Sequence, residues 1–282
     1  MEERKNKNGK KKPVWLVLAI VCIVVAIAAI AVVFKKNANE NKAESQYSSL
    51  ASQVNSQSEP VVSEPEEKTE YTLEEKIELI EEKYGMEVPR KNIDFADLQA
   101  NVNQDIYAWI YIPGTNVDYP VLQHPTDDGF YLMHNLDGSY GYPSCVYSEM
   151  VNAKDFNDRV TVLYAHDLSG GRMFGDLKYF EQKEYFDANR YIYIYLPDDI
   201  LVYEIVSSFK HSDAHLMYAY DWSNDDVFLN FLDRAAHVTS EGNSLEAYTF
   251  DVDDKALVLS TCIRPEPQRR RLLLGVLLNE AY

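Results

Sequence analysis

The sequence predicts one mainly β domain with helical insertions, placed after an N-terminal membrane anchor and a polar linker. After Asn103 the chain changes to short runs of β-branched and aromatic residues that alternate at period two, as strands do. The chain of 282 residues is 46% hydrophobic and 12% aromatic, so it is too apolar to be mostly disordered. Strands and helices do not alternate regularly, which argues against a doubly wound fold. We therefore expect a β-barrel or a β-sandwich with helical insertions.

Charge and cysteine content exclude several functions. Residues 1–36 contain eight Lys or Arg and only two Glu, although the whole chain has a net charge of −18. The rest of the chain is thus strongly acidic, and an acidic surface does not attract nucleic acid. The three cysteines, Cys22, Cys145 and Cys262, are too few for a disulfide scaffold or a cysteine-based zinc site. The sequence contains no HExxH, CxxC or glycine-rich phosphate motif, so we expect no metal and no organic cofactor.

Residues 14–34 form an uninterrupted run of 21 uncharged residues. As a helix this run would be roughly 31 Å long, which matches the hydrocarbon core of a bilayer. The alternative is a cleaved signal peptide, but its apolar region would be only about 7–15 residues long. Six Lys or Arg precede the run within residues 1–13. By the positive-inside rule we expect a cytoplasmic tail at 1–13, a lipid-embedded anchor at 14–34 and the remaining chain outside the cell membrane.

Residues 35–70 are mostly Asn, Ser, Glu, Gln, Lys and Pro, a composition that predicts a flexible extracellular stalk. One folded domain is expected at 71–282. It begins with a helix at 72–84, because Thr72 and Glu75 form a capping box before apolar residues at helical spacing. A second short helix is expected at 94–102.

The remaining pattern is mainly of strands. They are predicted at 107–112, 117–122, 160–165, 191–196, 201–209, 256–261 and 272–278. A Pro-Asp-Asp run at 197–199 suggests that the fourth and fifth of these form a hairpin. Helical stretches interrupt the series at 173–180 and 225–236, and the second has a clear apolar face.

Cys262 is a candidate nucleophile. It ends an apolar strand and is followed by a polar loop and then by three arginines at 269–271. A thiol at a strand end beside a cation can form a thiolate, and the cation can stabilise an oxyanion. The alternative is a small core residue with an ordinary solvated arginine edge.

His166 is the candidate for proton transfer among the six histidines. It directly follows the apolar strand predicted at 160–165 and precedes a loop that contains Gly170 and Gly171. A strand end places a side chain at the rim of a barrel, where a cleft can form. The alternative is a hydrogen-bonded loop residue, and the other five histidines are expected to be surface or packing residues.

These residues lie in motifs that resemble a known family. The segment Leu259-Ser260-Thr261-Cys262, with an Arg that leads the next strand, resembles the active-site signature of the sortases, which are cysteine transpeptidases of Gram-positive cell surfaces. The segments 164–167 (YAHD) and 172–177 (RMFGDL) resemble the catalytic-His region of class B sortases. The segments 103–105, 108–110, 113–115 and 119–123 resemble the first strands of that class. The resemblance extends, in order, over residues 73–282.

The resemblance implies an eight-stranded β-barrel with N-terminal helices and a long helix between strands six and seven. It implies that Cys262 is the nucleophile and that His166 acts as general acid and then as general base. The third catalytic residue is an Arg five residues before a small residue of the last strand. Because Gly275 is that small residue, this spacing identifies Arg270.

Strand alternation agrees with this assignment, since it places Arg270 on the opposite face from its two neighbours, Arg269 and Arg271. Ser260 and Thr261 are expected to contact substrate. Val258 departs from the family, which has Thr at this position, and we expect a buried valine that leaves the nucleophile in place.

The implied activity is that of a membrane-anchored cysteine transpeptidase. Its partners would be secreted proteins with a C-terminal sorting signal, cleaved after a Thr, and an amine of the peptidoglycan cross-bridge or its precursor. One alternative keeps the fold but uses a pilin Lys as the amine and so polymerises pilins. Another is a non-enzymatic, surface-anchored β domain in which Cys145 and Cys262 form a structural disulfide.

Overall fold

A computed structural model describes residues 14–56, 71–238, 242–245 and 248–278. The chain divides into two units, residues 1–42 and residues 43–282. In the first, the structure describes the N-terminal part of helix α1 (Val14–Asn55). This helix is long and apolar enough to cross a membrane, with a mean hydropathy of 3.0 in its most apolar window. The predicted cytoplasmic tail and residues 57–70 of the predicted stalk lie outside the described residues.

The C-terminal part of α1 belongs to the folded domain. Its residues Ala43, Tyr47, Leu50 and Val54 are buried and recur at the spacing of one helix face. The Tyr47 hydroxyl donates a hydrogen bond to the carbonyl oxygen of Ser144 at 2.5 Å. The structure therefore differs from the predicted flexible stalk over these residues. A few apolar residues on one face of an otherwise polar helix are enough to keep this segment helical, because the folded domain covers them.

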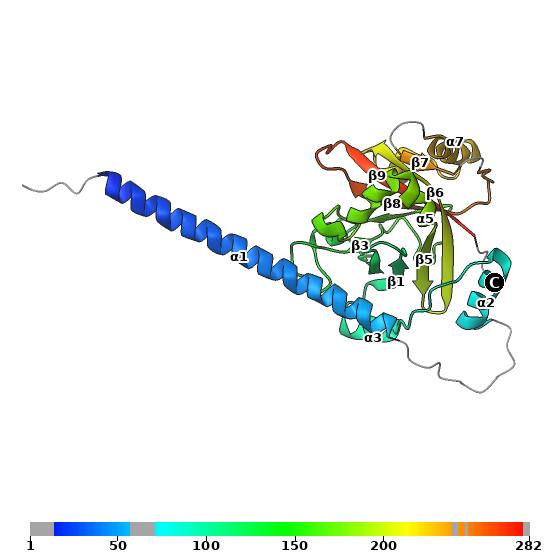
Figure 1. Ribbon diagram of the computed structural model, residues 1–282, viewed down its shortest axis with the longest axis horizontal. Helices are drawn as coiled ribbons and strands as arrows, with labels where there is room; N and C mark the ends of the chain where they lie inside the picture. The colour runs from blue at the N-terminus through cyan, green and yellow to red at the C-terminus, as the bar shows by residue number, and fades with distance from the viewer. Residues whose placement is uncertain (1–13, 57–70, 239–241, 246–247, 279–282) are drawn as a thin grey trace, which may run out of the picture. The chain divides into compact units, whose positions relative to one another are not determined.

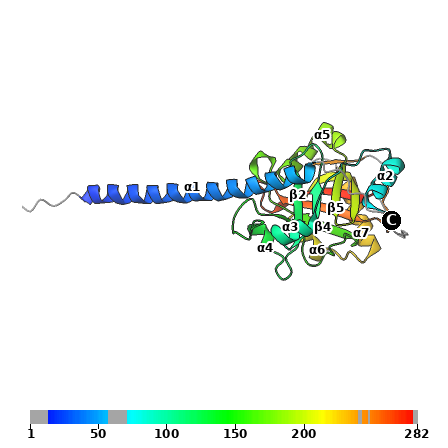
Figure 2. The ribbon, with the colours of Figure 1, turned by 90° about the horizontal axis from the view of Figure 1, so that it is seen from below.

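The domain is built around a closed eight-stranded barrel (Figures 1 and 2). Its strands follow one another around the ring as β5-β1-β2-β3-β4-β8-β9-β6, and β6 pairs with β5 to close it. The short strand β7 (Gly242–Ser244) pairs with β6 outside this ring. The barrel strands are β1 (Ile106–Tyr111), β2 (Asp118–Leu122), β3 (Val146–Tyr147), β4 (Val160–Tyr164), β5 (Tyr191–Leu196), β6 (Asp199–Ser212), β8 (Ala256–Cys262) and β9 (Arg269–Leu277). The prediction of a barrel is confirmed, but the two-residue strand β3 was not among the predicted strands.

Helices lie around the barrel, as Figure 2 shows. The two predicted N-terminal helices are α2 (Leu73–Tyr84), which starts with the expected capping box at Thr72, and α3 (Phe95–Asn101). Helix α7 (Asp225–Ala236) has the predicted bounds and lies between the sixth and seventh barrel strands in chain order. The shorter helices are α4 (Phe130–Met133), α5 (Lys183–Ala188), α6 (Leu216–Ala219), and the 3₁₀ segments η1 (Ser169–Gly171) and η2 (Gly175–Glu181). The helix predicted at 173–180 is thus a 3₁₀ segment that starts later.

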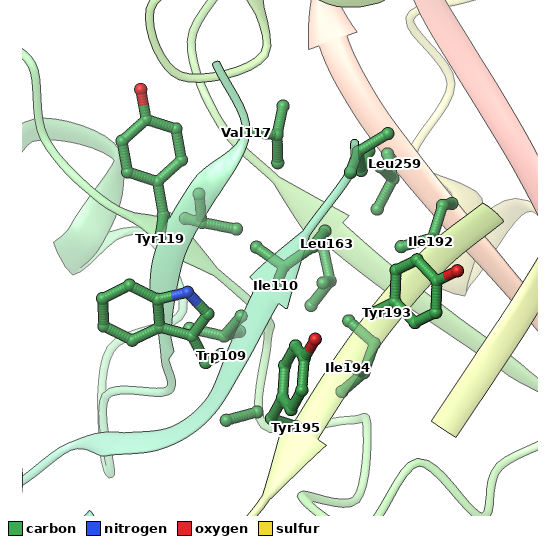
Figure 3. Packing of buried hydrophobic residues seen from close by; sticks show 14 of the residues in the cluster. Trp109, Ile110, Val117, Tyr119, Leu163, Ile192, Tyr193, Ile194, Tyr195 and Leu259 are labelled. Atoms are coloured by element: carbon green, nitrogen blue, oxygen red, sulfur yellow. The ribbon is translucent and has the colours of Figure 1, made fainter. Parts of the chain in front are cut away.

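Strand alternation divides the apolar residues of the barrel into two clusters. Side chains such as Ile110, Leu163 and Leu259 point inward and form the barrel core (Figure 3). Their neighbours Val162 and Val258 belong to a second cluster, which helix α7 covers from outside. The outer face is therefore apolar where α7 packs on it. Farther along the same strands, α7 no longer covers the outer face of the barrel.

Candidate active site

The predicted catalytic residues come together in one pocket. Cys262, His166 and Arg270 all line a cavity of about 260 Å³ at the ends of strands β4, β8 and β9. On strand β8 the lining residues Ser260 and Cys262 alternate with inward-facing Leu259. The pocket thus occupies the outer face of the sheet, next to the part that α7 covers.

Cys262 is the last residue of β8, and its side chain is exposed. Cys145, by contrast, is buried beside the Tyr47 hydroxyl, whose oxygen lies 3.3 Å from its sulfur. Burial raises the pKa of the Cys145 thiol to about 12. Both cysteines are free thiols in the structure, which contradicts the alternative of a disulfide between them. An exposed thiol in a pocket can act as a nucleophile, whereas a buried protonated one is a core residue.

Parallel pairing of β4 with β8 places His166 beside the nucleophile's strand. Tyr164 is paired with Ser260, so the register carries His166, two residues after Tyr164, next to Cys262, which is two residues after Ser260 and ends β8. The Thr261 hydroxyl reinforces this junction, because it donates a hydrogen bond to the Ala165 carbonyl oxygen at 2.8 Å. Thr261 therefore has a structural role in addition to its place in the pocket lining.

The ring of His166 is held in a defined orientation. Its Nε2 lies 2.6 Å from the carbonyl oxygen of Leu132, and the ring of Tyr142 packs edge-on against it with centroids 4.9 Å apart. A carbonyl oxygen can only accept, so Nε2 carries the hydrogen and Nδ1 of the neutral ring is free to take a proton. Desolvation, helped by the positive charge of Arg264, lowers the pKa of His166. The neutral imidazole is thus the form that the site favours.

The segment 172–177 (RMFGDL) forms backbone contacts with His166 and Asp167. The backbone N–H of Phe174 donates to the His166 carbonyl oxygen at 3.0 Å, and Asp167 forms a bridge with Met173. The Asp176 carboxylate then accepts hydrogen bonds from both the backbone and side-chain nitrogens of Asn116, each at 2.8 Å. This motif therefore ties the loop after β4 to the barrel.

Two adjacent arginines of β9 have different environments. Arg270 is directly opposite Cys262 in the β8–β9 pairing and lines the pocket. Its Nη1 donates to the carbonyl oxygen of Pro267 at 2.9 Å. Arg271 points to the other face, is buried, and binds the Glu181 carboxylate through Nε and Nη2 at 3.1 and 2.7 Å. Of these two arginines, Arg270 lines the pocket and Arg271 does not.

The other residues singled out in the sequence lie where strand alternation predicts. Ser260 lines the pocket on the same face as Cys262. Val258, which departs from the family pattern, is fully buried against Leu274 and the α7 helix, so its methyl groups contribute to packing.

Besides Asp213, two ionisable residues of the pocket were not predicted from the sequence. Glu149, which follows β3, and His215, which precedes α6, both line it together with Tyr147, Tyr164 and Leu132. The His215 side chain is 42% exposed, as expected for a surface histidine, but it also lines the pocket. Both residues are in loops, where no periodicity indicates which way a side chain points. Among the described residues there is no cluster of His, Cys, Asp or Glu that could hold a metal ion.

Comparison with known proteins agrees with this architecture. No protein-family profile matches the chain. The chain is 32% identical over 96 residues to sortase B of Listeria monocytogenes, covering 34% of this chain and 38% of that protein. It is 25% identical over 164 residues to sortase B of Staphylococcus aureus, covering 57% and 64%. The chain thus spans less than two thirds of the length of either relative.

Solved structures show the same fold. A mutant form of Clostridium perfringens sortase B superposes with a TM-score of 0.58 at 24% identity, covering 65% of this chain and 86% of that one. Bacillus anthracis sortase B in complex with the compound AAEK2 gives 0.57 at 26% identity, with 66% and 83% covered. A Streptococcus pyogenes class B sortase involved in pilus biogenesis gives 0.56 at 25% identity, with 66% and 98% covered.

Proposed function

We propose that this chain, which has the fold of the class B sortases and resembles sortase B proteins in sequence, is a membrane-anchored cysteine transpeptidase. The observation that carries the proposal is the convergence of Cys262, His166 and Arg270 on one pocket at the strand ends. Its substrates would be secreted proteins with a C-terminal sorting signal that is cleaved after a Thr. Helix α1 would hold the enzyme in the cell membrane, with the domain outside and the basic residues 1–13 in the cytoplasm.

The geometry supports a two-step acyl transfer. His166 starts neutral and takes the thiol proton of Cys262 through Nδ1, and the sulfur attacks the Thr carbonyl carbon. The C–N bond then breaks, and His166 gives its proton to the leaving amine, which leaves a thioacyl enzyme. An incoming amine loses a proton to His166 and attacks the thioester carbon, the C–S bond breaks, and His166 returns the proton to the Cys262 sulfur. Arg270 donates hydrogen bonds to the carbonyl oxygen as its negative charge develops in each step.

The acceptor is proposed to be an amine of the peptidoglycan cross-bridge or its precursor, so that the product is a surface protein attached to the cell wall. A pilin Lys is the second candidate. The observation that favours it is the similarity to the Streptococcus pyogenes class B sortase involved in pilus biogenesis. The two acceptors differ in chemistry, since one is an amine of a short cross-bridge peptide and the other a lysine in a folded protein.

Incubation of the full chain in detergent with Thr-containing sorting peptides and an amine tests the proposal. We expect an amide-linked product, ping-pong kinetics and loss of both cleavage and transfer in Cys262→Ala. Cys145→Ala is the matched control and should retain turnover, because its thiol is buried outside the pocket. If every cross-bridge peptide and Lys-bearing protein gives only hydrolysed product, the proposed transpeptidase activity is refuted. Retained turnover in Cys262→Ala would refute the nucleophile.

A further inference from the structure

Helix α4 supplies the hydrogen-bond partner of the candidate catalytic histidine. The carbonyl oxygen of Leu132, a residue of α4, accepts the hydrogen of Nε2 of His166 across 2.6 Å. Helix α4 has only four residues, so it cannot be stable by itself in water. The direction of the Leu132 carbonyl must therefore be set by the contacts that α4 makes with the rest of the domain.

The contacts that hold α4 differ along its length. Just after its C-terminal end, the backbone of His134 pairs with that of Tyr140. Within the helix, Tyr131 is buried in the core of the domain. The N-cap position is occupied by Gly129, and glycine has no side chain that could cap a helix. The N-terminal end of α4 therefore depends on the contacts of its first residue, Phe130.

The ring of Phe130 is stacked between two imidazoles. Its centroid lies 4.4 Å from that of His124, with 22° between the planes, and 4.0 Å from that of His134, with 4° between the planes. Aromatic pairs usually have centroids about 4.5–7 Å apart, so both contacts are close. A ring packed on both faces has little freedom to shift, and this restricts the backbone that carries it.

Both imidazoles are themselves held in place. The Nδ1 atom of His124, which lies two residues after β2, accepts hydrogen bonds from the backbone N–H groups of Thr126 at 3.3 Å and Asp127 at 3.0 Å. The Nδ1 atom of His134 lies 2.8 Å from the carbonyl oxygen of Phe130, which can only accept, so this nitrogen donates. The stack thus connects the start of α4 both to a barrel strand and to the residue that follows the helix.

We propose that Phe130 is a positioning residue, whose stack with the two imidazoles aims the Leu132 carbonyl at Nε2 of His166. This inference rests on the proposed function. The bond to Leu132 keeps the hydrogen on Nε2 and leaves Nδ1 as the nitrogen that exchanges protons during acyl transfer. Leu132 lines the pocket, whereas Phe130 does not. Loss of the Phe130 ring should therefore act on the catalytic imidazole and not through a direct contact with substrate.

Substitutions that remove or keep the ring test the inference on the full chain in detergent. Phe130→Leu keeps an apolar side chain but removes the ring. It should lower kcat about tenfold or more with a much smaller change in KM, because a misplaced catalytic group slows the reaction. Phe130→Tyr keeps the ring and should retain most of the wild-type kcat. Tyr140→Ala is the control, since Tyr140 is 70% exposed and meets His134 edge-on, so kcat should stay near wild type.

NMR of the His166 ring separates this inference from the proposed function, because it requires no turnover. In the wild-type chain the bond to Leu132 should protect the Nε2–H from exchange with water, so that its proton signal is visible. His166→Gln assigns this signal by its disappearance. In Phe130→Leu the signal should be lost through faster exchange, and Phe130→Tyr should restore it. This pattern supports the inference even if no sorting peptide is turned over.

Several results would overturn the inference. One is a His166 Nε2–H signal that is the same in the wild-type and Phe130→Leu chains, whether present or absent. Another is a rise in KM at unchanged kcat, which would place the effect on the pocket wall at Leu132. Thermal unfolding shows whether Phe130→Leu is folded. If it is not, His134→Ala removes one side of the stack, and the same loss of kcat and of the signal is expected.

Discussion

Cys262 and Arg270 are directly opposed on the antiparallel strands β8 and β9, while the next arginine along β9 points to the other face of the sheet. Opposed residues of an antiparallel pair have Cα atoms about 4.5–5.5 Å apart. The guanidinium can therefore reach the carbonyl of a peptide bound to the thiol without any change in the backbone. Its neighbour, in contrast, is tied to Glu181 at 2.7 Å.

This difference predicts opposite phenotypes for two adjacent substitutions. Arg270→Ala should lower kcat/KM about a hundredfold or more, as the loss of one oxyanion donor does, with little change in melting temperature. Lys at 270 should restore little activity, because a point charge cannot reproduce the planar guanidinium fork. Initial rates with a sorting peptide measure both. A normal rate in Arg270→Ala would contradict its assignment.

Arg271→Ala should act on stability. It removes a buried guanidinium and leaves the Glu181 carboxylate unpaired, so the free energy of unfolding should fall by about 2 kcal/mol or more, discounted for the partial exposure of the carboxylate. Denaturant unfolding measures the loss. Turnover per folded molecule should change much less than in the Arg270 variant.

The two cysteines of the folded domain should react very differently with thiol reagents. Cys262 is exposed, whereas Cys145 is buried and burial raises its pKa to about 12. Brief treatment of the native chain with iodoacetamide, followed by peptide mass spectrometry, should therefore modify Cys262 and spare Cys145. Both should react after unfolding in urea. Faster labelling of Cys145 in the native state would mean that the exposure of the two thiols is reversed.

The titration of His166 gives a prediction with a definite sign. Desolvation and the charge of Arg264 lower its pKa, so the ring should titrate below the ordinary value of about 6.5. Arg264→Gln should raise the pKa toward that value. NMR of the His166 ring protons measures both midpoints, and the acidic limb of kcat/KM should move in the same direction.

The same shift has a consequence for stability. Since the folded pKa is depressed, the unfolded state binds more protons between the two pKa values. The contribution of His166 is therefore present above the unfolded pKa and is lost as the pH falls through the folded pKa. A His166→Gln variant should lose less stability on acidification than the wild-type chain. An equal loss in both would show that other groups account for acid unfolding.

Helix α1 supplies a further test, on residues that the sequence predicts to be part of a flexible stalk. Leu50 is buried on this helix, whereas Gln53 is exposed on it. Leu50→Ala should reduce the free energy of unfolding by about 2 kcal/mol or more, because a core leucine loses both burial and packing. Gln53→Ala should be within about 0.5 kcal/mol of wild type. If the two variants were equally stable, the result would instead support a flexible stalk over these residues.

The sequence predicted those helices and strands in which several apolar residues recur at the helical or the strand period. Helix α7 buries five apolar residues, and its bounds agree with the prediction. Alternation along β9 was enough to put Arg270 and Arg271 on different faces. Glu149 and His215 could not be predicted, because loop geometry and not periodicity brings them together. Tyr47, Leu50 and Val54 did carry a helical spacing, but the polar residues between them dominated the composition.

The hydrogen bond from Thr261 to the Ala165 carbonyl joins residues 96 positions apart in the chain. Contacts between such distant segments are slow to form, since the intervening chain must first lose its freedom. In the unfolded polypeptide, Cys262 is an ordinary cysteine without an imidazole or a guanidinium beside it. It acquires these partners only when β8 enters between β4 and β9 and completes that part of the barrel. The arrangement of these three side chains therefore depends on contacts between segments that are far apart in the chain, so it cannot exist before this part of the barrel is assembled.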